Sequence, residues 1–290
     1  MKANNTKRAV IIAILMLCQL AISSFAPLVS SLCDGYIKVL AVKLIYAVSF
    51  LIPCFLWKRV FKPVGDNHSK HAWCEYRLPA FFIAFAAIVA CLQVNVVLLE
   101  LFPYEKAASG GFMPDGFWGF LFSLLMYAVI PAITEELFFR GVILRVAGGG
   151  FWAAVLSGAL FGLCHFNPLQ LVYSVGSGIV LGLLCLYTSD IKLPVLLHLC
   201  VNTVVLVLSY ASRAVEVGVY VAAECILWLL ILGIGIYFCY VLLRDHQIEI
   251  NERTKDIKNI KTDISRAELV SPAMIVVCVA IILATVLRLI

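Results

Sequence analysis

The chain has 290 residues, of which 63% are hydrophobic and 13% charged, and its mean hydropathy is +1.03. A soluble domain carries about 25% charged and 45–50% apolar residues. The composition therefore excludes an ordinary soluble domain and indicates a polytopic membrane protein. In a soluble protein the net charge of +5 would suggest an acidic partner, but in a membrane protein the placement of basic residues indicates topology.

Apolar runs of about 20 residues, the length needed to cross ~30 Å of hydrocarbon, recur along the whole chain. We therefore predict an all-α fold, a polytopic transmembrane helical bundle. The first run is long for the apolar core of a signal peptide, so we expect it to be a retained anchor. The expected spans are 9–32, 38–57, 79–102, 117–147, 151–167, 169–189, 193–212, 219–243 and 271–290.

Most of the 22 Lys and Arg residues gather on one side of these spans if the N-terminus is cytoplasmic. Positively charged loops stay in the cytoplasm, so we predict an N-terminus inside. Short loops and the lack of a soluble domain favour a bacterial plasma membrane. The cytoplasmic basic residues would lie in segments 2–8, 58–77, 140–145, 192 and 244–266.

Residues 244–270 form the long polar segment of the chain, with Ile257, Ile260 and Ile264 at helical spacing. We expect a solvated cytoplasmic linker helix there, which joins a transmembrane core of 1–243 to an extra C-terminal span at 271–290. The eleven cysteines include no C-x-x-C pair, so we expect neither a disulfide framework nor a cysteine-rich metal site.

Small residues recur every fourth position in two neighbouring spans. Such stripes allow helices to approach closely in lipid, although they carry no information about chemistry. The two stripes are Ala154, Gly158 and Gly162, and Ser174, Gly178 and Gly182.

Two adjacent carboxylates and an arginine interrupt the apolar run from Phe117 to Ala147. A charged side chain in the bilayer core costs at least ~2.5–3.5 kcal/mol, so it needs a partner or a task. Glu136 and Arg140 stand at i and i+4 with the acid first, the favourable order for a helical ion pair. Glu135 is rotated by about 100° and can face a different neighbour.

Three further polar groups lie in apolar runs: His165, and His198 with Asn202 at i and i+4 on one helix face. The Gly148–Gly150 turn places Glu135 and His165 at similar depth, ~20 Å and ~22 Å along their helices. His198 lies only ~8 Å into its span, so the three meet if the glycine-rich hairpin projects from the cytoplasmic face.

This set of residues can hydrolyse an amide. A carboxylate beside an imidazole can take a proton from water and return it to a leaving amine. Imidazole and amide N–H groups can stabilise an oxyanion, at roughly 3–4 kcal/mol per donor. The chain contains no G-x-S-G, G-x-G-D or H-E-x-x-H motif, so other intramembrane protease signatures are missing.

The three sites together resemble the motifs of the CPBP family, which contains CAAX proteases and bacteriocin-processing enzymes and is also called the Abi family. The resemblance covers about 117–212, each motif on an expected helix. It implies an eight-helix core and cleavage of peptides within or beside the membrane by a glutamate-activated water. The motifs are Glu135-Glu136-x-x-x-Arg140, Phe161-x-x-x-His165 and His198-x-x-x-Asn202.

By this resemblance Glu135 is the general base and His165 assists the water, while His198 and Asn202 form the oxyanion hole. Glu136 and Arg140 are supporting residues and Phe161 is a packing residue. No cofactor is implied. The expected partners are the lipid bilayer and a peptide substrate, and no nucleic acid. The substrate is a prenylated tail, a leader peptide or another membrane-bound peptide. Residues 244–290 lie outside the family's usual core.

Three alternatives remain open. Glu135, His165 and His198 could hold zinc, with water as the fourth ligand, in a zinc-dependent version of the protease. The chain could be a non-catalytic immunity or scaffold protein that keeps the polar cluster for packing. A proton-coupled transporter with Glu135 and His165 as a relay lacks repeat symmetry and paired broken helices.

Overall fold

The computed structural model describes residues 2–60, 76–101, 112–245, 251–252, 254–257, 276–277 and 279–280. All regular structure in these residues is helical, which confirms the expected all-α fold. The elements are α1 Lys2–Ser23, α2 Ala26–Leu32, α3 Gly35–Val60, α4 Arg77–Leu101, α5 Gly116–Leu124, the π-helical turn η1 Leu125–Val129, α6 Ile130–Phe138, the π-helical turn η2 Phe139–Ile143, α7 Leu144–Val146, α8 Phe151–Leu163, α9 Pro168–Thr188, α10 Lys192–Ala214 and α11 Val217–Asp245.

Within the described residues, seven helical segments are long and apolar enough to cross a membrane. They match seven of the expected spans, so the protein is a polytopic membrane bundle. The expected span at 151–167 is shorter than predicted, because α8 has only 13 residues and extends ~20 Å. The expected span at 271–290 falls almost entirely outside the described residues.

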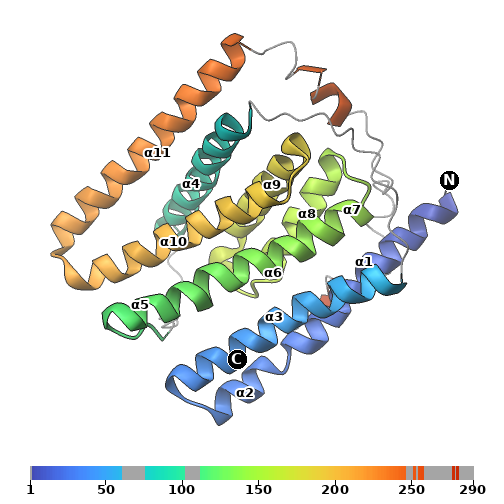
Figure 1. Cartoon of the computed structure of the whole chain (residues 1–290), viewed down its shortest axis with the longest axis horizontal. Coiled ribbons are helices and arrows are strands. Elements are labelled where there is room, and N and C mark those ends of the chain that lie inside the picture. The colour runs from blue at the N-terminus through green and yellow to red at the C-terminus, as the bar shows by residue number, and fades with distance from the viewer. Residues whose placement is uncertain are drawn as a thin grey trace.

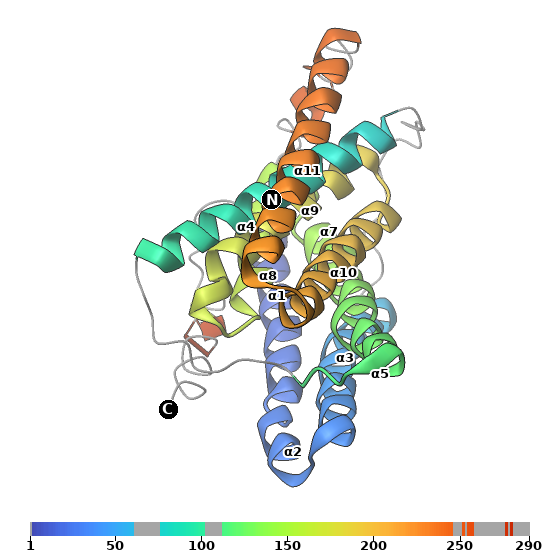
Figure 2. The same cartoon turned by 90° about the vertical axis from the view of Figure 1, so that its left-hand side faces the viewer.

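The helices form a bundle in which the fourth span, Gly116–Val146, lies between α3 and α10 (Figure 1). α1 packs on α3, α3 packs on α6, and α10 packs against η1, α6 and α9. α4 lies between α9 and α11, and Figure 2 shows α11 extending away from the α1–α3 end of the molecule. This arrangement surrounds α6 with helices from distant parts of the sequence.

The fourth span, Gly116–Val146, is interrupted by η1 and η2, which flank the short helix α6. Pro131 explains the first interruption, because it has no N–H to donate to the carbonyl of Tyr127 and its ring crowds that carbonyl. Single π turns are frequent at functional sites. Here they bracket the helix that carries Glu135 and Glu136.

The two stripes of small residues lie at the interface between α8 and α9, as expected. A Cβ atom built on Gly158 would approach the backbone nitrogen of Ile179 to 2.5 Å, and one built on Gly178 would approach the Cα of Gly158 to 2.8 Å. These separations are too short for ordinary side chains, so glycine is required for the two helices to pack this closely.

The start of the expected linker helix contacts the bundle. Thr254 and Tyr187 share a hydrogen bond of 2.9 Å between their hydroxyl groups, and Ile257 is buried. Most of 244–290 lies outside the described residues, so the division into core, linker and extra span stays a prediction.

The α8–α9 packing generates a stability prediction. We expect Gly158→Ala to lower the free energy of unfolding by about 1–3 kcal/mol, because the added methyl group forces the two helices apart. The matched control is Gly233→Ala in the middle of α11, where a Cβ would meet nothing within 4 Å. That change should be neutral or stabilise the helix by about 0.5–1 kcal/mol. Thermal unfolding in detergent measures both, and equal stability of the two variants would contradict the prediction.

Candidate active site

A cavity of about 620 Å³ lies between α3, α4, η1, α6, α9 and α10. Its lining includes the four residues expected to do the chemistry: Glu135, His165, His198 and Asn202. They come from α6, from the turn after α8, and from α10. Glu135 and both histidines therefore line one cavity, and His198 lies within 3.9 Å of Glu135.

The predicted ion pair between Glu136 and Arg140 is present and fully buried. Nη1 of Arg140 donates to Oε1 of Glu136 at 2.8 Å, and Nη2 donates to the carbonyl oxygen of Gly178 at 2.6 Å. Arg140 is only 1% exposed. The guanidinium therefore ties η2 and α6 to α9 at the point where α9 packs on α8.

The two adjacent carboxylates have different surroundings. Oε1 of Glu136 also lies 2.9 Å from Nδ1 of His198, so it accepts from the histidine as well as from Arg140. Glu135 is 3% exposed, and its Oε2 has no hydrogen-bond partner in the described part of the chain. Glu136 is thus paired twice through Oε1, although among the described residues its Oε2 also lacks a hydrogen-bond partner, while Glu135 lines the cavity with no hydrogen bond to its Oε2.

His198 lies between the two carboxylates. Because the carboxylate of Glu136 can only accept, Nδ1 of His198 carries the hydrogen of that bond. Its other nitrogen, Nε2, lies 3.9 Å from Oε2 of Glu135, beyond hydrogen-bond distance but close enough for a charge interaction. From the sequence we expected Glu136 to pair with Arg140 alone, so its contact with His198 was not predicted.

His165 lies in the turn after α8, whereas the sequence argument expected it within a helix. Phe166, which follows it, has φ +50°, a left-handed conformation that is costly for a bulky residue. Nδ1 of His165 is 2.9 Å from the carbonyl oxygen of Phe161, which can only accept. Nδ1 therefore carries a hydrogen, and Nε2 of the neutral ring is left with a lone pair that can accept a proton.

Phe161 packs against three of the polar side chains, in agreement with the expected packing role. Its ring lies edge-on to His165 and to His198, with centroids 4.8 Å and 5.7 Å away. The guanidinium of Arg140 lies 4.9 Å from the same centroid, a cation–π distance. The ring of Phe161 thus contacts side chains from the turn after α8, from α10 and from η2.

The donor set gives no support to the zinc alternative. No three His, Cys, Asp or Glu side chains are grouped to hold a metal ion anywhere in the described ranges.

Asn202 lines the cavity one helical turn beyond His198, and its amide can donate without any change of protonation.

Other polar residues of the lining were missed by the sequence argument. They are chiefly Lys43, Asn95, Tyr127 and Tyr173, from α3, α4, η1 and α9. Lys43 had a signal, since it is a cation inside the apolar run 38–57. The tyrosines had none, because an aromatic residue in a span is equally suited to face lipid, a neighbouring helix or a cavity.

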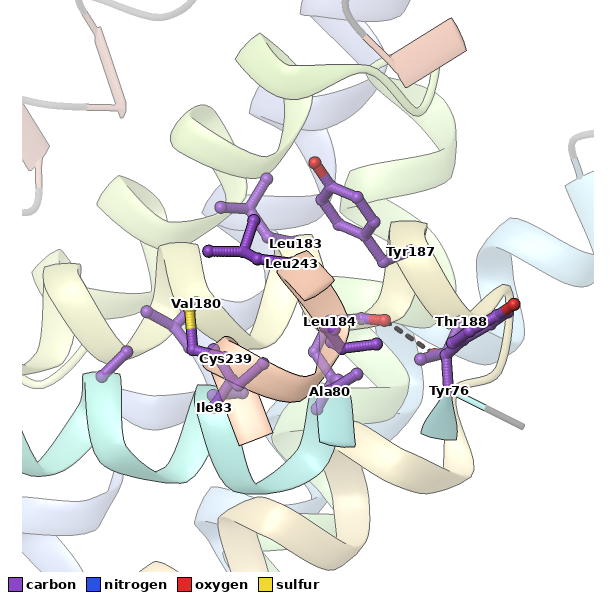
Figure 3. A pocket seen from close by; sticks show the side chains of 13 residues that line it. Tyr76, Ala80, Ile83, Val180, Leu183, Leu184, Tyr187, Thr188, Cys239 and Leu243 are labelled. Atoms are coloured by element: carbon purple, nitrogen blue, oxygen red, sulfur yellow. Dashed lines mark hydrogen bonds between the residues drawn. The ribbon is translucent and has the colours of Figure 1, made fainter. Parts of the chain in front are cut away.

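A second hollow of about 360 Å³ lies between α4, α9 and α11 (Figure 3). Its thirteen lining residues are almost all apolar and include no carboxylate, imidazole or amine. The hydroxyl of Thr188 in this lining donates back to the carbonyl of Leu184 at 2.7 Å, within its own helix. The residues that can perform acid–base chemistry therefore lie in the larger cavity.

Comparison with known proteins agrees with this location. Residues 117–204 match the family model described as type II CAAX prenyl endopeptidase Rce1-like. An uncharacterized protein of Bacillus subtilis (strain 168), YyaK, is 30% identical over 130 residues, which are 43% of this chain and 42% of YyaK. The match thus spans less than half of that relative's length. No solved structure matches the chain.

The matched segment contains α5 to α9 and most of α10, and with them every motif residue of the cavity. The match is to a family of CAAX prenyl endopeptidases, and it confirms the resemblance recognised from the three motifs. Residues 117–204 are therefore similar to the Rce1-like CAAX prenyl endopeptidases of the CPBP family.

Proposed function

We propose that this protein is an intramembrane endopeptidase that hydrolyses a peptide bond of a membrane-associated peptide by a water activated at Glu135. The observation that carries the proposal is the convergence on one cavity of a buried carboxylate whose Oε2 has no hydrogen bond among the described residues, two histidines and an amide. A carboxylate in such a position is poised to take a proton, and a cavity of about 620 Å³ has room for water and a segment of a peptide.

In the proposed mechanism, Glu135 takes a proton from a water molecule whose oxygen attacks the scissile carbonyl carbon. His165 accepts a hydrogen bond from the same water at Nε2 and orients it. The proton then passes to the nitrogen of the leaving amine as the carbon–nitrogen bond breaks. The balance is one water consumed and one amine and one carboxylic acid released, with the acid's proton shared according to the pH.

Asn202 donates to the oxyanion that develops on the scissile carbonyl oxygen. His198 donates a second hydrogen bond to this oxyanion through Nε2. It does so when both ring nitrogens carry protons, because Nδ1 already donates to Glu136. In this reading Glu136 and Arg140 are positioning residues: they hold the ring of His198 so that Nε2 faces the cavity. Known oxyanion donors are worth roughly 3–4 kcal/mol each.

The substrate we propose is a peptide that reaches the cavity from the membrane, either a prenylated tail or a segment with a leader. We place the protein in a bacterial plasma membrane with its N-terminus in the cytoplasm. The ion pair between Arg77 and Asp190, 3.5 Å apart, is consistent with this orientation, because it joins the start of α4 to the α9–α10 turn on one side of the bundle.

The orientation predicts the location of reporters. A reporter fused after Asp245, at the end of α11, should be on the cytoplasmic side, and one inserted between α10 and α11 at Glu216 should be outside. Alkaline phosphatase and fluorescent-protein fusions measure the two positions. Phosphatase activity at residue 245 would reverse the proposed topology.

The catalytic proposal predicts that Glu135→Gln abolishes product formation and leaves the protein folded, because the amide cannot accept the proton. Peptides released in membranes expressing wild type and Glu135→Gln are compared by mass spectrometry. The matched control is Glu224→Gln, which changes a carboxylate in α11 that accepts from Trp228 and is not part of the cavity lining.

Products that appear with wild type and with Glu224→Gln, but not with Glu135→Gln, support the protease and identify its substrate. If Glu135→Gln keeps the products or the phenotype, the non-catalytic scaffold is the better account. Elemental analysis of the purified wild-type protein tests the zinc alternative, and stoichiometric zinc lost on the same substitution would favour it.

We predict that Glu136 stabilises the folded protein and positions the ring of His198. Glu136→Gln leaves the guanidinium of Arg140 buried without its counter-charge, and breaking a buried pair in this way costs about 3–5 kcal/mol of unfolding free energy. Glu136→Gln combined with Arg140→Gln removes both charges, so we expect it to recover part of the thermal stability but none of the activity. Unfolding in detergent and the product assay measure the two effects. If Glu136→Gln is as stable as Glu135→Gln, the two carboxylates do not have separate tasks.

A further inference from the structure

Lys43 is a cation of the cavity lining that the proposed mechanism does not use. It lies in α3, inside the candidate span Gly35–Arg59. A charge at this depth is costly unless it meets a partner or serves a function. Its position among the lining residues makes its ammonium group accessible to a molecule that fills the cavity.

Aromatic rings hold Lys43 in place without neutralising it. Its Nζ lies 4.8 Å from the centroid of Tyr127 and 5.6 Å from that of Tyr46. The hydroxyl of Tyr127 donates to the carbonyl oxygen of Phe112 at 3.1 Å, so this ring is itself anchored. Among the described residues no carboxylate forms an ion pair with Lys43 within 4.0 Å, so its charge stays available to an anion.

The packing of α3 beside α6 shows where Lys43 lies relative to Glu135 along the axis of the fourth span. Lys43 contacts Tyr127 and, further along α3, Phe50 contacts Phe138 with ring centroids 5.5 Å apart, so the two segments run in the same direction (Figure 1). The backbones of Tyr127 and Glu135 are eight residues apart along the fourth span, a rise of ~12 Å. An extended peptide covers that distance with about three or four residues.

We propose that Lys43 binds a carboxylate of the peptide substrate, about three or four residues from the bond that is cut, and so determines specificity. This inference rests on the proposed function of the same cavity. The carboxylate can belong to the C-terminus of the peptide or to an Asp or Glu side chain. In both cases an ammonium group that is held by two rings in an apolar span forms a charge-assisted hydrogen bond with it.

A simpler role for Lys43 is to balance the charge of Glu135, since the two charges interact electrostatically. The two roles predict different dependence on the substrate. A charge-balancing lysine affects every substrate equally through the base. A lysine that binds the substrate affects only peptides that carry the carboxylate, and it acts mainly on KM.

The test uses the full-length protein in membranes and the peptides whose cleavage depends on Glu135. Wild type, Lys43→Met, Lys43→Arg and Lys38→Met are compared. Lys38→Met is the matched control, because Lys38 lies on the same helix but is not part of the cavity lining. Synthetic copies of the cleaved peptides are made in three forms: unmodified, with a C-terminal amide, and with Asp or Glu near the cut changed to Asn or Gln.

For wild type we expect one of the two neutralised peptides to show a KM roughly tenfold to a hundredfold higher than the unmodified peptide, the range expected for one charged hydrogen bond. Which form is affected identifies the source of the carboxylate. Lys43→Met should raise KM for the unmodified peptide by a similar factor, with little effect on the neutralised one. Lys43→Arg should recover part of the affinity, and Lys38→Met should behave as wild type.

The remaining outcomes overturn the inference in distinguishable ways. If no product depends on Glu135, the proposed function fails, and the inference fails with it. If cleavage occurs but all three peptide forms are cut equally, the protease stands and the role of Lys43 does not. An equal loss of kcat for every peptide in a folded Lys43→Met protein would assign Lys43 to charge balance. Thermal unfolding of Lys43→Met verifies that the protein remains folded.

Discussion

The buried guanidinium of Arg140 is the interaction on which the site depends. It donates to Glu136, donates to the carbonyl of Gly178, and lies against the ring of Phe161. A charge that is this far from water must find its partners inside the protein. Because those partners come from α6, α9 and α8, satisfying one side chain fixes the relative positions of three helices.

The chain of contacts continues from the ion pair to the cavity. Glu136 accepts from Arg140 and from Nδ1 of His198, so the same carboxylate that neutralises the arginine also orients a ring of α10. The ring then presents Nε2 toward Glu135 at 3.9 Å. The two adjacent carboxylates therefore have different surroundings. A rotation of 100° per helical residue directs Glu136 toward Arg140 and His198 and directs Glu135 into the cavity.

The packing of α8 on α9 is a precondition for this arrangement. The carbonyl of Gly178 can reach Arg140 only because α9 approaches α8 closely at Gly158, where a side chain would not fit. The stripes of small residues, which by themselves indicated no chemistry, therefore support the site through backbone geometry. The turn after α8, with its left-handed Phe166, then brings His165 to the cavity instead of extending the helix.

The sequence by itself determined the features that depend on local spacing and composition: the membrane class, most spans, the small-residue stripes, the Glu136–Arg140 pair and the set of motif residues. Each follows from the period of a helix or from the cost of a charge in lipid, so each can be derived from neighbouring positions. Only the tertiary structure decided which distant groups meet. The contact between Glu136 and His198 joins residues 62 positions apart, and Lys43 and Tyr127 enter the cavity because α3 packs beside the fourth span. Such contacts depend on how whole helices pack, and a helical pattern specifies a face but not the partner that covers it.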